Sequence, residues 1–424
     1  MKQLSFNRLD RIVAVALIIS SVLPYFALPL GVSTNVPFSS IFGGYLLIRG
    51  CRDRRIFWLS AGVLLAPFLA SFFRMFITSE QWSVAGSLTW VISLIPLSAM
   101  VVAVLALKSA LIGWLRAILI FSAGISLVQK YFFLDQGVVP WLWVYDVPGY
   151  APVRLLAPTI AAYIRRPFGL FPEPSFMGGT LGIVAIALIL TAMAFKRPLR
   201  VIDWVALALT CWVTAISGSG TAIVAPFLIV ICAALPLFKR FAGILAIIMP
   251  LLLFAVGTAA SLVLNQRQSV TNWSWVDRSN SIIAAVRYLF SDVAVFFLGI
   301  GRGNTSPYFL SGKIPTNDLP HSEVLPDVYS VFLRVVLENG VLFGLPIILL
   351  MMFFVVRADT SSKLRISGWA ALIIWLIAGG LAISYDSAFW LFGFPGMMYG
   401  LWLCQSAGAK EKEPGPPAQL DAVV

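Results

Sequence analysis

Long apolar runs recur along this chain at a length that suits a lipid bilayer. A helix needs about 20 apolar residues to cross the hydrocarbon core of a membrane. Runs near that length fill much of the 424-residue sequence, and only 11% of the residues are charged, about half the usual share in soluble domains. This pattern excludes a soluble globular protein and predicts an all-α polytopic membrane protein.

The runs predict about twelve transmembrane helices and two long polar segments between them. The expected helices cover residues 12–30, 35–48, 57–73, 84–107, 110–134, 176–195, 201–217, 219–237, 241–264, 335–356, 366–383 and 388–403. We call residues 135–175 the first segment and residues 265–334 the second segment. The resulting order is helices one to five in 1–134, the first segment, helices six to nine in 176–264, the second segment, helices ten to twelve in 335–403 and a polar tail in 404–424.

Basic residues mark alternate loops between the expected helices. The net charge is +12, which in a soluble protein would suggest nucleic acid but in a polytopic one suggests basic cytoplasmic loops. If the N-terminus is inside, every cytoplasmic loop is basic and both long segments face outward. The basic residues of these loops are Arg49, Arg52, Arg54, Arg55, Lys108, Lys196, Arg197, Arg200, Lys239, Arg240, Arg357, Lys363 and Arg365. We therefore predict cytoplasmic termini and no nucleic-acid partner.

The sequence contains few of the residue patterns that bind metal ions, which argues against metal-dependent reactions. The chain has four cysteines without a C-x-x-C pair, so neither a zinc site nor a disulfide framework is indicated. The single histidine, His321, excludes any metal site that requires two imidazoles. There is also no D-x-D pattern of the kind that clamps a metal-bound nucleotide sugar. We predict a metal-independent reaction without a cofactor.

The cations of the two long segments are mostly arginines. A guanidinium group binds phosphate oxygens through two parallel hydrogen bonds, whereas a lysine offers only a point charge. An outward-facing diphosphate is the ligand that this composition favours. The alternative is that the arginines pair with carboxylates of their own segments.

Glu173 lies in the run Phe171-Pro172-Glu173-Pro174-Ser175-Phe176, which leads directly into an expected helix. The flanking prolines favour extended backbone before the helix begins, and the positive end of the helix dipole favours a carboxylate. Glu173 is then either a capping or ion-pairing residue, or a general base that receives a proton from a sugar hydroxyl.

The second segment contains further candidate residues. The run from Gly299 to Asn304, Gly-Ile-Gly-Arg-Gly-Asn, is either a turn or a loop whose exposed N–H groups cradle a phosphate. Arg334 and Glu338 have i, i+4 spacing and are expected to pair on one helix face. Residues 282–298, which precede the glycine run, are expected to form one interfacial helix.

Isolated charges also interrupt the expected helices. For Arg74, Arg116 and Asp203, snorkelling of the charged group to the membrane interface is a sufficient explanation.

Several short motifs, in this order, resemble the O-antigen ligase and O-antigen polymerase family of bacterial envelope proteins. They are Glu173-Pro174-Ser175 at a helix start, the turn Ser217-Gly218-Ser219-Gly220-Thr221, the run Gly299–Asn304, and Val331–Gly344 at the opening of the next helix. Ligases of this family carry a His-Asn pair in the second segment. Here His321 is followed by Ser322, which favours the polymerase branch.

The resemblance implies a membrane glycosyltransferase of the GT-C-like type in the bacterial inner membrane. It would join polyprenyl-diphosphate-linked oligosaccharide repeat units into O-antigen or exopolysaccharide on the outer side. Glu173 or His321 would take the acceptor proton. The arginines available for the diphosphate are Arg154, Arg165, Arg166, Arg278, Arg287 and Arg302, with Arg334 at the start of the next helix.

The implied partners are the lipid-linked oligosaccharide, the surrounding membrane lipid, and chain-length regulator and flippase proteins. Two alternatives stay open. One is a ligase that transfers glycan to a lipid core, and the other is a flippase or transporter for the same lipid-linked sugars, which fold-level analogy does not separate from an enzyme.

Overall fold

The computed structural model describes most of the chain. The described residues are 5–23, 27–29, 35–78, 84–140, 165–171, 173–234, 273–316, 319, 328–359, 365–381 and 389–410.

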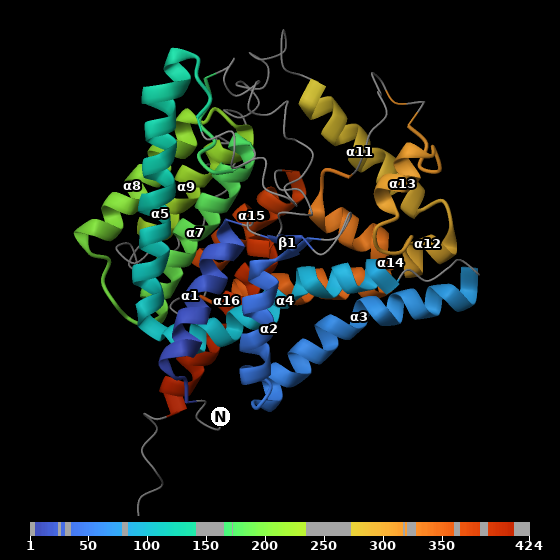
Figure 1. The fold of residues 1–424 in the computed structure, drawn as a ribbon, viewed down its shortest axis with the longest axis horizontal. Helices are drawn as coiled ribbons and strands as arrows, with labels where there is room; N and C mark the ends of the chain where they lie inside the picture. Colours follow the sequence, from blue (N-terminus) through green and yellow to red (C-terminus); the bar gives the residue numbers. More distant parts are fainter. Residues whose placement is uncertain are drawn as a thin grey trace, which may run out of the picture.

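The described residues form an assembly of helices (Figure 1). The helices are α1 (Arg8–Val22), α2 (Phe38–Gly50), α3 (Arg54–Thr78), α4 (Val84–Leu107), α5 (Leu111–Val128), α7 (Pro174–Ala194), α8 (Val201–Ile216), α9 (Gly220–Ala234), α11 (Trp273–Leu289), α12 (Val293–Leu298), α13 (Thr305–Leu310), α14 (Val331–Arg357), α15 (Ile366–Leu381) and α16 (Phe389–Lys410). Two three-residue strands, β1 (Ala27–Pro29) and β2 (Asn35–Pro37), pair antiparallel with Leu28 opposite Val36.

The centre of the molecule is built from α4, α7 and α16. Every residue of α7 from Ser175 to Ala192 is buried, as expected for a helix that is hydrophobic on all sides. Helices α4 and α16 pack very closely, because a Cβ atom at Gly396 would lie 1.7 Å from the carbonyl oxygen of Leu97. Side chains larger than glycine are therefore excluded at that crossing.

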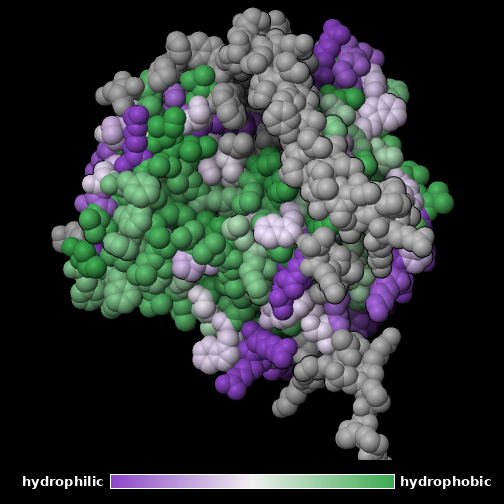
Figure 2. Space-filling view, turned by 180° about the vertical axis from the view of Figure 1, so that it is seen from behind, coloured by the Kyte–Doolittle hydropathy of each residue, from purple (hydrophilic) through white to green (hydrophobic). Residues whose placement is uncertain are grey.

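The outer helices expose large apolar side chains. Trp58, Phe72 and Phe76 of α3 are well exposed, as are Val201 and Trp212 of α8. Figure 2 shows hydrophobic side chains gathered across one face, with hydrophilic ones toward its upper and lower rims. Apolar surface of this extent is unfavourable in water and favourable in lipid.

Length and composition make four of the described helical stretches able to cross a membrane. They are Arg54–Ile77, Trp90–Gln136, Pro174–Ala194 and Val331–Arg357, and three shorter apolar helices accompany them. The structure is therefore compatible with a helical membrane protein, as the composition predicts.

Each of the twelve expected segments contains a helix, except residues 241–264, which lie outside the described residues. Two expectations are wrong in detail. Residues 27–29 and 35–37 are strands, not the end of the first expected helix and the start of the second. Proline lacks the N–H group that a helix interior requires, and Pro24, Pro29 and Pro37 punctuate this stretch.

The expected single helix over residues 282–298 is also wrong. The structure has two helices there, α11 and α12, because the Asp292 side chain accepts hydrogen bonds from the backbone N–H groups of Ala294, at 2.6 Å, and Val295, at 3.1 Å. This geometry starts a new helix.

Candidate functional site

Glu173 lies where the first segment enters α7, in extended backbone with φ −144° and ψ 155°. Its Oε2 atom accepts a hydrogen bond from Ser175 Oγ at 3.0 Å and one from Arg278 Nη2 of α11 at 3.1 Å. The side chains of Glu173 and Arg278 are 29% and 17% exposed. This ion pair joins the two long segments at a position that solvent reaches.

The alternative to a general base, that Glu173 is a capping or ion-pairing residue, is confirmed through ion pairing. The side chain makes no capping hydrogen bond to the start of α7, but it does form the ion pair with Arg278. Among the described residues, none donates a hydrogen bond to its other oxygen, Oε1. Glu173 therefore has one carboxylate oxygen held in place and one that faces no described donor.

Buried side-chain contacts hold the end of the first segment. Gln129 Oε1 accepts from the backbone N–H groups of Phe168 and Gly169 at 2.8 Å and 2.7 Å. Arg166 Nε donates to the carbonyl oxygen of Ser217 at 2.6 Å. Ser217 belongs to the turn between α8 and α9, so this predicted diphosphate ligand is engaged with protein backbone.

Arg278 is also tied to the start of α14. Its guanidinium group lies 5.8 Å from the ring centroid of Tyr329. The backbone N–H of Tyr329 donates to Ser281 Oγ at 3.3 Å, and Ser330 caps α14 by accepting from Leu333 N. Helix α11 is thus fixed against α14 while its Arg278 contacts Glu173.

A second ionic cluster is buried at the first two turns of α14. Arg302 Nη1 lies 3.0 Å from Glu338 Oε2, and Arg334 Nε lies 2.8 Å from Glu338 Oε1. Thr305 Oγ1 donates to the same Oε1 at 2.8 Å. The side chains of Arg302, Arg334 and Glu338 are 5%, 8% and 0% exposed. The predicted pairing of Arg334 with Glu338 is confirmed.

The glycine run at 299–304 packs against α14. The N–H groups of Ile300 and Gly301 donate to the carbonyl oxygens of Leu337 and Glu338 at 2.8 Å and 3.0 Å. The interpretation of this run as a phosphate cradle is therefore wrong for these two N–H groups, because α14 already occupies them.

Two glycines with positive φ allow that contact. A Cβ atom at Gly299 would lie 2.4 Å from the backbone nitrogen of Gly340, and a Cβ atom at Gly340 would lie 2.1 Å from the carbonyl oxygen of Phe297. Gly340 has φ 70° and ψ 172°, which interrupts the helical geometry of α14. The loop and the kink thus depend on each other.

Arg74 contacts the glycine run and α13, whereas its place in an apolar run suggests snorkelling. That interpretation is wrong, because Arg74 is only 6% exposed. Its Nη1 donates to the carbonyl oxygen of Gly299 at 2.7 Å, and its Nη2 contacts the Tyr308 hydroxyl at 3.4 Å. The sequence feature that could have predicted these contacts is the isolation of Arg74 at the end of an apolar run, because a charge at membrane depth normally faces protein.

Arg116 and Asp203 likewise contact each other, with Arg116 Nη1 3.2 Å from Asp203 Oδ1. This ion pair makes snorkelling unnecessary as an explanation for either residue.

The remaining predicted residues fall into two groups. Arg165 and Arg287 are exposed. Arg154 and His321 lie outside the described residues. No group of three or more His, Cys, Asp or Glu side chains that could hold a metal ion occurs in the described part of the chain.

Comparison with known proteins does not assign a function to this chain, so any assignment depends on the residues described above. No protein-family model matches this chain, and no curated protein matches it either. The resemblance to the O-antigen ligase and polymerase family accordingly stays a prediction.

Proposed function

We propose that this chain is a membrane glycosyltransferase that polymerises polyprenyl-diphosphate-linked repeat units on the outer face of a bacterial inner membrane. The proposal includes about twelve spans, a GT-C-like architecture and cytoplasmic termini. The observation that carries it is the Glu173–Arg278 pair, where a carboxylate and a guanidinium group from the two long segments meet and remain partly exposed.

The proposed reaction needs a proton acceptor and stabilisation of an anionic leaving group. A hydroxyl of the acceptor sugar attacks the anomeric carbon of the donor chain, the bond from that carbon to the diphosphate oxygen breaks, and polyprenyl diphosphate leaves. The carboxylate of Glu173 receives the hydroxyl proton. The diphosphate ester supplies the driving force, so no nucleotide is required.

Arg278 has two parts in this mechanism. In the resting state it positions Glu173, because its Nη2 and Ser175 Oγ both contact Oε2. As the diphosphate leaves, the guanidinium group stabilises the developing negative charge, which raises the rate because the interaction is strongest in the transition state. His321 stays the alternative proton acceptor, and the exposed Arg165 and Arg287 stay candidates for diphosphate binding together with Arg154.

The structure of the buried cluster argues against placing the diphosphate there. Arg302 and Arg334 are almost fully buried and share Glu338. We therefore assign these two predicted ligands a supporting part, in which they fix the second segment on α14.

A transporter for the same lipid-linked sugars is the second candidate. One observation favours it: α14 is interrupted at Gly340, next to buried charged groups. Transporters commonly place substrate groups at such broken helices. An enzyme would instead extend the glycan in a purified system without a second compartment.

Surface polysaccharide from a deletion strain tests the proposal. The polymerase account predicts single repeat units on the lipid, full banding after complementation with the wild-type gene, and no long chains with Glu173→Gln. Loss of all added glycan would favour the ligase or transporter, and long chains from Glu173→Gln would remove it as the base. Asp292→Asn, an exposed carboxylate of the second segment, is the matched control and should restore long chains.

A further inference from the structure

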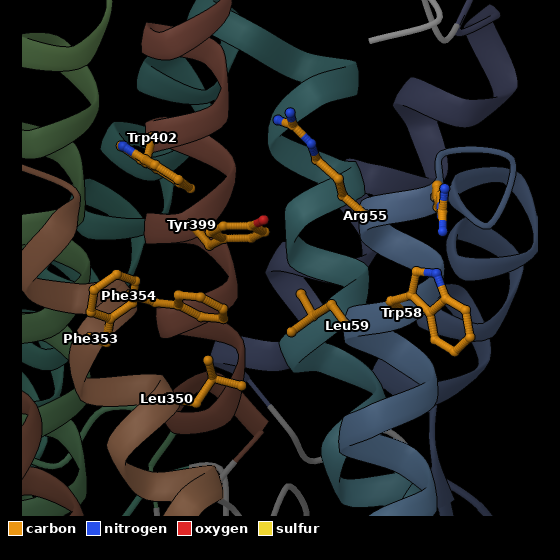
Figure 3. Close-up of a pocket in the computed structure, with 9 residues that line it drawn as sticks. Arg55, Trp58, Leu59, Leu350, Phe353, Phe354, Tyr399 and Trp402 are labelled. Atoms are coloured by element: carbon orange, nitrogen blue, oxygen red, sulfur yellow. The ribbon is translucent and has the colours of Figure 1, made fainter.

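A groove lies between α3, α14 and α16 (Figure 3). It has a volume of about 710 Å³. Trp58 and Leu59 of α3 form one wall, and Leu350, Tyr399 and Trp402 form the other. The surface inside the groove is thus aromatic and aliphatic, which suits a hydrocarbon chain.

The groove continues along the seam between α3 and α14. A second hollow of about 250 Å³ shares Trp58, Leu59 and Leu350 and extends to Ala66. From Arg55 to Ala66, α3 rises roughly 16 Å at 1.5 Å per residue. This is about half of the 30 Å hydrocarbon core, so the seam matches the depth of one leaflet.

Cationic side chains surround the open end of the groove. Arg54 and Arg55 line it and are exposed, and the Arg55 side chain extends toward the end marked by Trp402 (Figure 3). Arg357 of α14 lies 5.6 Å from the ring centroids of both Phe353 and Trp402. Three guanidinium groups therefore stand where the headgroup of a lipid in the groove would lie.

The nearby carboxylates are buried and engaged by backbone. Asp53 Oδ1 accepts from the N–H of Arg55 at 2.9 Å, and Asp359 Oδ2 accepts from the N–H of Ser367 at 3.1 Å. Both residues are almost fully buried. The charge presented to a headgroup at this rim is consequently positive.

We propose that this groove binds one anionic glycerophospholipid from the leaflet that contacts the basic ends of the helices. Its phosphate lies against Arg54 and Arg55, and one acyl chain follows the seam between α3 and α14. Membranes carry their anionic lipids in the leaflet that basic residues face, so the charge and the depth of the groove agree on this occupant. The proposal does not depend on the function proposed above.

Retention of lipids by the purified full-length protein tests the inference. Native mass spectrometry would compare the first bound phosphatidylglycerol with phosphatidylcholine of identical acyl chains. We expect a preference for phosphatidylglycerol of about thirtyfold, as for two cationic side chains at a membrane surface. The double variant R54Q/R55Q should lose this preference. The variant R52Q removes an exposed arginine of the same turn that does not line the groove, and it should keep the preference.

A second variant tests the acyl-chain path without changing charge. Leu59→Trp fills the groove and should lower the retention of both lipids. The preference for phosphatidylglycerol among the lipid that is still retained should be the same as in R52Q. Equal retention of the two lipids by the wild-type protein would overturn the proposal. An equal loss of the preference in R52Q and R54Q/R55Q would also overturn it, because it would show general attraction to a basic surface. A dimer of this chain that forms only when lipid is removed would overturn it as well.

Discussion

The two ionic clusters of this molecule use the same residue types in opposite environments. Arg302, Arg334 and Glu338 are withdrawn from solvent, with exposed fractions of 5%, 8% and 0%, whereas Glu173 and Arg278 keep 29% and 17%. A buried charge that loses its partner is costly, while an exposed pair contributes little to stability. The buried cluster of Arg302, Arg334 and Glu338 therefore suits the maintenance of the fold, and the exposed pair suits the proposed chemistry.

This difference changes how the arginines of the two segments are interpreted. The sequence offers them as equivalent phosphate ligands, but the structure separates them by burial and by partner. Arg166 contacts a backbone carbonyl, Arg302 and Arg334 share a carboxylate, and Arg278 contacts the one candidate base described here. Function is best sought at Arg278 and Glu173.

The strongest test of the comparison is Glu338→Gln. Removing the carboxylate leaves Arg302 and Arg334 buried beside a neutral amide, which should lower the free energy of unfolding by about 3–5 kcal/mol. Thermal unfolding in detergent, followed by size-exclusion chromatography, measures the loss. Glu338→Asp keeps the charge and should be milder. An unchanged unfolding midpoint for Glu338→Gln would contradict the structural part assigned to this cluster.

The contact between the glycine run and α14 predicts the next largest effect. Gly340→Ala introduces a Cβ into a glycine-only backbone region and against the carbonyl of Phe297, which should cost about 3 kcal/mol. Gly303→Ala is the matched control, because Gly303 also has positive φ (82°) but open space around it. It should cost about 1–2 kcal/mol. Equal losses would show that the close approach is not needed.

The ion pair between Asp10 of α1 and Arg49 of α2 is intermediate in exposure between these two clusters. The Asp10 side chain is 0% exposed, and its Oδ2 lies 2.9 Å from Nη2 of Arg49, which is 28% exposed. The hydrogen bond from the Arg49 guanidinium holds the pKa of Asp10 below its ordinary value. Asp10→Asn should therefore lower the free energy of unfolding by about 1.5–3 kcal/mol near neutral pH.

The pH dependence of that difference has a definite sign. Because the folded pKa of Asp10 is the lower one, the ion pair stabilises the protein above the ordinary carboxyl pKa of about 4. The stabilisation is lost as the pH falls through the lowered value. Unfolding midpoints of the wild type and Asp10→Asn should converge in acid, and a gap that widens there would refute the assignment.

The smallest effect on stability is expected at the exposed pair. Arg278→Gln should change the free energy of unfolding by about 1 kcal/mol or less, yet remove most of the polymer from a complemented deletion strain. Gel banding and the unfolding midpoint, measured on the same preparation, separate the two effects. A loss of folded protein comparable to that of Glu338→Gln would erase the distinction between the clusters.

Local features of this structure could be predicted from the sequence. The apolar runs predict the helices because a backbone in lipid must satisfy its own hydrogen bonds. The Arg334–Glu338 contact follows from spacing of four residues on one helix. The position of Glu173 before α7 follows from Pro174, which occupies the first turn of the helix.

Contacts between distant parts of the chain could not be predicted in this way. Arg74 meets Gly299, and Arg302 meets Glu338, through packing that no local period encodes. The positive φ of Gly340 arises because the glycine run packs against it, since an isolated Gly in an apolar helix is compatible with regular geometry. The β1–β2 pair was missed because the apolar run continues across its prolines.

The central claim is that Glu173 acts in chemistry and not in folding. The most direct measurement is polymer formation by the purified protein in vesicles supplied with polyprenyl-diphosphate-linked repeat units, with the unfolding midpoint recorded in parallel. The account predicts long chains from the wild type and none from Glu173→Gln, with midpoints that agree closely. Long chains from Glu173→Gln, or a wild-type protein that moves the lipid-linked units across the bilayer without joining them, would contradict it.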